Sequence, residues 1–178
     1  MNQPTMPPQT EQPTPVEIDA LKLQRFRQNI KENQNFSLGL FAGLAAAAIG
    51  ALLWALVTDL THYQIGWMAV VVGFLVGFSV RRFGRGIDPV FGVMGAILAL
   101  GGCLVGNLLS ACMILARQES LDFMDVLVRL NPSVSMELLT ATFHPLDALF
   151  YGIAIYQGYR FSFRQISPQE VSGLVKTS

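Results

Sequence analysis

The chain has 178 residues, of which 52% are hydrophobic and 13% charged, and its formal net charge is zero. A soluble domain carries roughly 25% charged residues, so this composition has too few charges to cover a surface that faces water. The absence of a basic excess also argues against nucleic acid as a partner. The cysteines, Cys103 and Cys112, lie in one apolar run at a spacing that places them on opposite sides of a helix, so they can neither pair nor share a metal.

The N-terminal part divides into two segments. Residues 1–15 contain five prolines and almost no aliphatic side chains, which predicts a disordered tail rich in Pro and Gln. Residues 16–32 read as an amphipathic helix, with an apolar arc that includes Leu23 and Phe26 and with basic residues on its flanks. We expect this helix to lie at the cytoplasmic membrane interface, and the alternative is a helix that binds a partner protein.

Residues 33–164 are predicted to form a membrane domain. A helix needs roughly 20 apolar residues to cross the hydrocarbon core, and three uncharged stretches reach that length. A fourth, shorter stretch begins at Pro145 with Asp147 in its first turn, both typical of a helix N-terminus. The fold class predicted is all-α, a four-helix transmembrane bundle with short interfacial helices. The predicted spans are residues 36–58, 63–80, 89–116 and 145–163.

The third and fourth spans are joined by an outer amphipathic segment, residues 119–143. Ser120 is a candidate cap there, and Pro132 separates two short helices. We expect the segment either to lie on the membrane surface or to cap the bundle. Residues 165–178 are the predicted cytoplasmic C-terminal tail.

The distribution of Lys and Arg predicts the orientation. Ten of the twelve precede the first span, lie between the second and third, or follow the fourth. By the positive-inside rule both termini are predicted to be cytoplasmic, and an even number of spans is consistent with both lying on one side. Five arginines at span ends are candidates for fixing topology and meeting lipid headgroups: Arg81, Arg82, Arg85, Arg160 and Arg164. The alternative to this topological role is that the loop "RRFGRG" binds an anion. The loop contains no Walker or dinucleotide-binding motif.

Small residues recur at helical spacing in the first three spans, and "GLFAG" and "GFLVG" are both G-x-x-x-G motifs. Helices in lipid associate through such faces because small side chains let their backbones approach closely. The pattern predicts a tight bundle, and the same faces could instead seal a homo-oligomer. The predicted packing glycines are Gly39, Gly43, Gly50, Gly66, Gly73, Gly77, Gly95, Gly102 and Gly106.

Candidates for chemistry are few. Asn107 lies within a predicted span, and His144 and Asp147 stand at the start of another. Helix packing for Asn107 and helix capping for the other two are the alternatives that we favour. Asp59 and His62 could join His144 and Asp147 at the outer face, but their spacing is not diagnostic of a metal site. We therefore predict no catalytic residues, no metal and no cofactor.

The stretch "YQIGWMAVVVGFLVGFSVRRFGRGIDPVFGVMGAILALGGCLVGNLL", Tyr63 to Leu109, resembles a group of small bacterial multi-span membrane proteins whose activity is uncharacterised. The resemblance implies a bacterial inner membrane and supplies no activity or site residues. We expect a non-enzymatic membrane component, a scaffold or accessory subunit, whose partners are membrane lipids and either other proteins or further copies of itself. The alternative is a small oligomeric channel or transporter.

Overall fold

The computed structural model describes residues 20–63 and 65–172, and every regular element in this part of the chain is a helix. The predicted tail of residues 1–15 and the first residues of the predicted interfacial helix lie outside it, as do residues 173–178. Two compact units are present: one is Ile30–Arg164, and the other consists of the residues on either side of it. The second unit contains most of α1 (Ala20–Glu32) and all of α8 (Pro168–Ser172), which falls within the predicted C-terminal tail.

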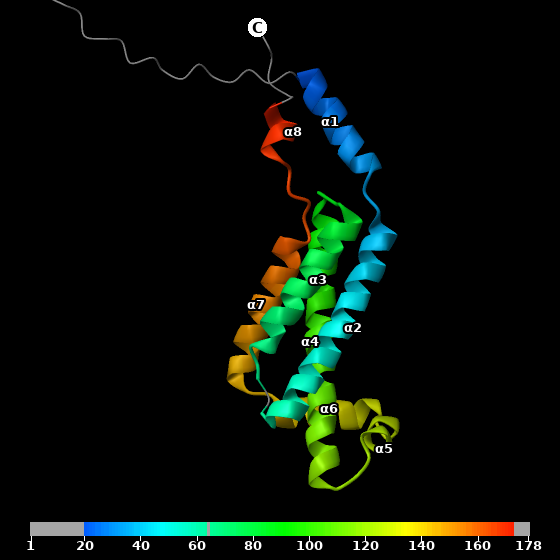
Figure 1. Ribbon diagram of the computed structural model, residues 1–178, viewed down its shortest axis with the longest axis vertical. Helices are drawn as coiled ribbons and strands as arrows, with labels where there is room; N and C mark the ends of the chain where they lie inside the picture. Colours follow the sequence, from blue (N-terminus) through cyan, green and yellow to red (C-terminus); the bar gives the residue numbers. More distant parts are fainter. Residues whose placement is uncertain (1–19, 64, 173–178) are drawn as a thin grey trace, which may run out of the picture. The chain divides into compact units, whose positions relative to one another are not determined.

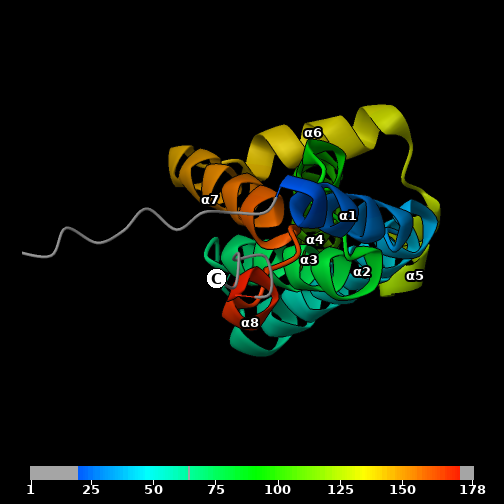
Figure 2. The same cartoon turned by 90° about the horizontal axis from the view of Figure 1, so that it is seen from above.

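The larger unit is organised around four helices: α2 (Phe36–Thr61), α3 (Met68–Gly84), α4 (Pro89–Gln118) and α7 (Pro145–Phe161). Helices α3 and α4 pack against each other, and each also packs against α2 and α7 (Figure 1). Seen along the helices, α2 and α7 stand on opposite sides of the α3–α4 pair (Figure 2). The centre of the group is therefore the α3–α4 interface.

Local signals explain where most of these helices begin and end. Asn35 caps α2, since its side chain accepts a hydrogen bond from the Leu38 amide at 2.9 Å. Pro89 and Pro145 occupy the first positions of α4 and α7, where a missing N–H costs nothing. Helices α2 and α3 end at His62 and Arg85, whose left-handed φ values of 59° and 51° turn the chain out of the helix.

Helix α3 is displaced from the predicted span 63–80. It begins at Met68 and ends at Gly84, and Trp67 at its N-cap makes no side-chain capping hydrogen bond. Gly66 therefore precedes α3, but it still packs closely against α7, because a Cβ there would lie 2.9 Å from the Phe150 ring. The C-terminal shift arises because Arg81 and Arg82 continue the helix, where cations are favoured by the helix dipole.

The interior of the group is built from small side chains. A Cβ placed on Gly73 of α3 would lie 2.6 Å from the carbonyl oxygen and 2.7 Å from the Cα of Ala154 on α7. The two backbones therefore approach closely. A Cβ on Gly39 would similarly lie 3.0 Å from the Cα of Gly84, and one on Gly102 would lie 2.8 Å from the Val72 side chain.

Two short helices, α5 (Phe123–Val128) and α6 (Pro132–Thr142), occupy the predicted outer segment 119–143 and pack on α4. Asp122 and not Ser120 is the N-cap residue of α5. Val126 is buried in one cluster with Cys112 and Ala116 of α4. The α6 axis is bent by 106° relative to that of α7, so the two helices run almost at right angles.

Two helices, α2 and α4, are long and apolar enough by themselves to cross a membrane. The bent pair of α6 and α7 reaches that length and apolarity only when its two helices are counted together. Helices α3 and α7 have 17 residues each, about 25 Å of helix. A helix of 17 residues is at the lower limit of the roughly 17–25 residues found for membrane helices.

Candidate functional site

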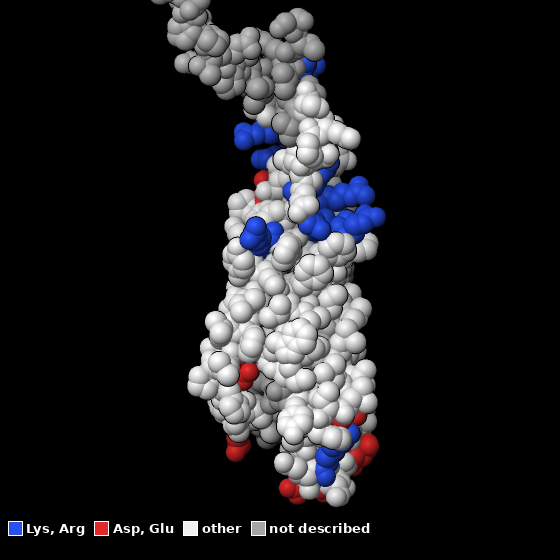
Figure 3. Space-filling view, turned by 60° about the vertical axis from the view of Figure 1, so that its left-hand side comes forward, with Lys and Arg blue, Asp and Glu red and all other residues white. Residues whose placement is uncertain are grey.

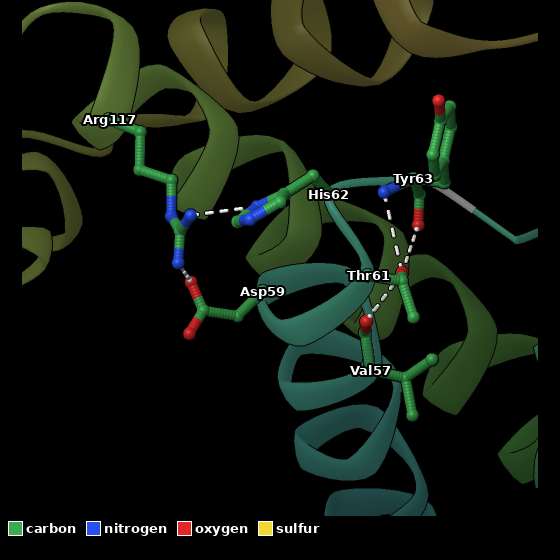
Figure 4. A network of polar contacts seen from close by, with 6 residues as sticks. All are labelled: Val57, Asp59, Thr61, His62, Tyr63 and Arg117. Atoms are coloured by element: carbon green, nitrogen blue, oxygen red, sulfur yellow. Dashed lines mark hydrogen bonds and ion pairs between the residues drawn. The ribbon is translucent and has the colours of Figure 1, made fainter.

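A polar cluster lies at the end of the helical group where α2 and α4 terminate, which we call the His62 end (Figure 4). Its centre is Arg117, whose guanidinium donates to the Asp59 carboxylate at 2.5 Å and to Nδ1 of His62 at 2.8 Å. A guanidinium can only donate hydrogen bonds, so Nδ1 of His62 is the acceptor in this geometry.

The end of α2 positions this cluster. The left-handed conformation of His62 lets its backbone N–H reach the Thr58 carbonyl at 2.9 Å and directs the ring toward α4. The Thr61 hydroxyl donates to the Val57 carbonyl at 2.7 Å and accepts from the Tyr63 amide at 3.3 Å. The turn after α2 is thus fixed by its own side chains.

A cavity of about 130 Å³ lies beneath the cluster. Asp59, His62 and Arg117 line it, together with Thr58 and residues of α4. Thr58 is buried and donates its hydroxyl hydrogen to Ser110 Oγ on α4 at 3.1 Å. The polar surface of the cavity therefore continues into a hydrogen bond between the two long helices.

Further polar groups lie deeper in the interior. Trp54 of α2, Asn107 of α4 and Tyr151 of α7 are all buried, and Asn107 lies next to the Tyr151 phenol. The Trp54 and Tyr151 rings meet edge to face with centroids 6.5 Å apart. Within the described residues, Nε1 of Trp54 is buried without a hydrogen-bond partner. These side chains connect α2 to α7, whose backbones do not pack directly.

His144 and Asp147 cap α7. The His144 backbone N–H donates to Oδ2 of Asp147 at 2.8 Å, and the two residues form a reciprocal capping box. The other carboxylate oxygen is 3.0 Å from where a Cβ would stand on Gly66. Asp147 thus lies between the start of α7 and the chain that enters α3.

The four residues considered as a metal site do not come together. Asp59 and His62 contact Arg117, whereas His144 and Asp147 contact each other. In the part of the chain that the structure describes, no group of three or more His, Cys, Asp or Glu side chains is placed to hold a metal ion.

The opposite end, where α3 and α7 terminate, carries the candidate arginines, and we call it the Arg85 end. The Arg81 guanidinium stacks on Phe78 at 5.1 Å, and Arg160 donates to the Tyr156 hydroxyl at 2.9 Å. The Asn35 backbone N–H donates to the Gly84 carbonyl at 3.0 Å, and the Arg164 backbone N–H donates to the Gly86 carbonyl at 2.8 Å. These backbone bonds join the start of α2 and the end of α7 to the turn between α3 and α4.

A space-filling view shows how the charges are distributed (Figure 3). Basic side chains gather at the Arg85 end, and acidic side chains gather at the His62 end together with a few basic ones. On the face drawn, no Lys or Arg interrupts the surface between them. On this face, a zone without Lys or Arg therefore separates two charged ends.

Sequence reasoning selected Asn107 and considered His62 as a metal ligand, but it did not recognise the two polar stripes to which these residues belong. Trp54, Thr58 and His62 recur every four residues on α2 and so share one face. Asn107, Ser110 and Arg117 lie on one face of α4 at the same kind of spacing. The two stripes could have been found by asking which faces of apolar helices carry hydrogen-bonding side chains.

No protein-family model, curated protein or solved structure matches this chain. The resemblance of Tyr63–Leu109 to bacterial multi-span proteins therefore stays a prediction.

Proposed function

We propose that the chain is a four-span integral membrane protein of a bacterial inner membrane, with both termini cytoplasmic. In this proposal α2, α3, α4 and α7 form a transmembrane bundle, and it acts as a non-enzymatic scaffold or accessory subunit. The proposed partners are lipids and either other proteins or further copies of the chain.

The observation that carries the proposal is the contrast between the outside and the inside of the helical group. Large apolar side chains face outward: Phe41 is 69% exposed, Leu52 62% and Ile97 64%. Small residues such as Gly73 and Ala154 fill the interior. Soluble monomers rarely expose apolar patches beyond a few hundred Å². Lipid, in contrast, favours oily surfaces and interfaces made of small residues.

The positions of aromatic and basic side chains support the proposed placement of the bundle across the membrane. Tyr63 and Trp67 are exposed at the His62 end, and Tyr156 lies beside Arg160 toward the other. Aromatic residues concentrate at both membrane–water interfaces, and long basic side chains extend to the headgroups. The right-angle bend between α6 and α7 agrees with an α6 that lies along the membrane surface once α7 crosses it.

The contacts that the polar candidate residues make support a structural role. Asp147 caps a helix, Arg117 joins α2 to α4, and Thr58 bonds Ser110 across the same interface. The Asp147 contact fixes the start of α7, and the other two contacts hold α2 and α4 together. The outward faces and the terminal segments are then the surfaces through which a scaffold would meet its partners.

The test combines membrane extraction with partner capture. The protein should stay in the membrane pellet after alkaline carbonate and require detergent for solubility. An affinity-tagged chain should co-purify a partner that is lost when residues 1–32 are deleted, and proteoliposomes should show no solute flux. A chain that is monodisperse in buffer without detergent would overturn the proposal.

A small channel or transporter is the second candidate, favoured by the buried polar line of Trp54, Asn107 and Tyr151 beneath the cavity. Polar side chains inside a membrane bundle commonly mark substrate or ion pathways. This function predicts flux in proteoliposomes that Asn107→Leu abolishes. Val105→Leu, which alters the exposed face of α4, should leave the flux unchanged.

A further inference from the structure

An apolar groove of about 470 Å³ runs along the surface between α2 and α3. Its floor is made by alanines of α2, including Ala42 and Ala45, and Ser79 of α3 also lines it. Phe41, Ile49 and Phe83 stand beside this floor as exposed ridges. The groove is hollow because small side chains alternate with large ones, and its volume lies within the roughly 300–1,000 Å³ of small-molecule pockets.

One arginine continues the groove. At 100° per residue, Arg82 falls within about 60° of Leu75 and Ser79, two of the three groove-lining residues of α3. Arg81 points more than about 100° away from them, toward Phe78, on whose ring it stacks. Arg82 is exposed. Arg82 therefore lies on the groove side of α3, beyond the groove lining at the Arg85 end, and Arg81 does not.

The groove has the depth of one lipid leaflet. On α2 its lining runs from Leu38 to Ile49, about 16 Å of helix. Half of a hydrocarbon core roughly 30 Å thick is about 15 Å. An acyl chain entering from the level of Arg82 would therefore reach the end of the groove near the middle of the bilayer.

From this geometry we infer that the α2–α3 groove is a binding site for one anionic phospholipid, with an acyl chain over Ala42 and Ala45 and the phosphate at Arg82. The inference rests on the proposed membrane location, because only then does the groove meet lipid. Basic pockets between transmembrane helices are suited to anionic headgroups. A parallel second copy fits less well, since it would bring a second Arg82 to the same level, where like charges repel.

The experiment is a titration of the detergent-purified full chain, followed by native mass spectrometry. The probes are phosphatidylglycerol and phosphatidylcholine with identical acyl chains. The wild type should bind one phosphatidylglycerol in preference to phosphatidylcholine. Arg82→Gln should weaken that binding about fivefold, which corresponds to about 1 kcal/mol per basic residue. Arg81→Gln, its neighbour on another face, should change it by less than about twofold.

A second pair of variants tests the groove itself. Ala45→Leu fills the floor and should remove saturable binding of phosphatidylglycerol, whereas Ala48→Leu should not, because Ala48 lines a different groove between α2 and α4. Both alanines are exposed, so neither leucine should disturb the interior. Equal weakening by Arg81→Gln and Arg82→Gln would overturn the inference, as would a change of oligomeric state in Ala45→Leu with lipid binding intact. Release of the wild type by carbonate would instead refute the membrane location.

Discussion

Gly73 shows how little space separates α3 from α7. A methyl group there meets the Ala154 backbone, which cannot move aside as a flexible side chain can. Gly101, on α4, has nothing within 4 Å of its added Cβ. The same Gly→Ala substitution is therefore expected to have opposite effects at Gly73 and at Gly101.

We predict that Gly73→Ala lowers the free energy of unfolding by about 1–3 kcal/mol, the cost of overpacking a tight interior. Gly101→Ala should be neutral or stabilise by up to about 1 kcal/mol, because alanine favours the helix. Unfolding in mixed micelles with rising dodecyl sulfate measures both. Equal stability of the two variants would mean that α3 and α7 do not pack as closely as the structure has them.

The residue scale also shows what sequence patterns can and cannot resolve. Glycine spacing indicated which positions face other helices, because only small residues permit close approach. It could not show that Gly66 precedes α3, since a glycine in a turn and a glycine in a helix look alike in an apolar run. Nor could it pair Gly73 with Ala154, because the partner helix lies far along the chain.

At the scale of elements, the start of α7 depends on Asp147. We predict that Asp147→Ala destabilises the protein by about 0.5–2 kcal/mol, since it removes the carboxylate that accepts the His144 backbone N–H. Glu137→Ala, which removes an exposed acid within α6, should cost less than about 0.5 kcal/mol. Thermal unfolding in detergent compares them, and equal losses would show that the cap is not what Asp147 contributes.

The buried Thr58–Ser110 hydrogen bond joins α2 to α4. A double-mutant cycle with Thr58→Val and Ser110→Ala isolates its contribution, because each variant removes one partner. We predict a coupling free energy of about 0.6 kcal/mol and at most about 1.7 kcal/mol, the range measured for such bonds between membrane helices. A coupling free energy of zero would mean that the two hydroxyls do not form this hydrogen bond.

Helix boundaries were predictable wherever a local signal marks them. The first residues of α2, α4 and α7 coincide with the predicted starts because Asn35, Pro89 and Pro145 act on their own neighbours in sequence. Helix α3 lacks a side-chain cap, and its predicted start was too early. The cluster of Asp59, His62 and Arg117 could not be predicted, because it depends on where two long helices end relative to each other.

For the whole molecule, the distribution of charge makes the sharpest prediction. The Arg85 end carries Arg81, Arg82, Arg85, Arg160 and Arg164. Within the described residues of the larger unit, the Lys and Arg residues at the His62 end are Arg117 and Arg129 alone. For the proposed membrane protein, the positive-inside rule predicts that the Arg85 end is cytoplasmic. The cysteines of the wild type, Cys103 and Cys112, are both buried, so they leave a low background for thiol labelling.

We predict that a membrane-impermeant maleimide labels Ser133→Cys in intact cells and labels Arg85→Cys only after the membrane is permeabilised. Ser133 lies near the start of α6, and Arg85 in the turn between α3 and α4, both exposed. The two residues are at opposite ends of the helical group, so one orientation requires opposite labelling. Labelling of both positions in intact cells would contradict a single orientation. The reverse pattern would mean that the spans cross the membrane in the opposite direction. The Arg85 end would then lie outside the cell, and the lipid groove would lie in the outer leaflet.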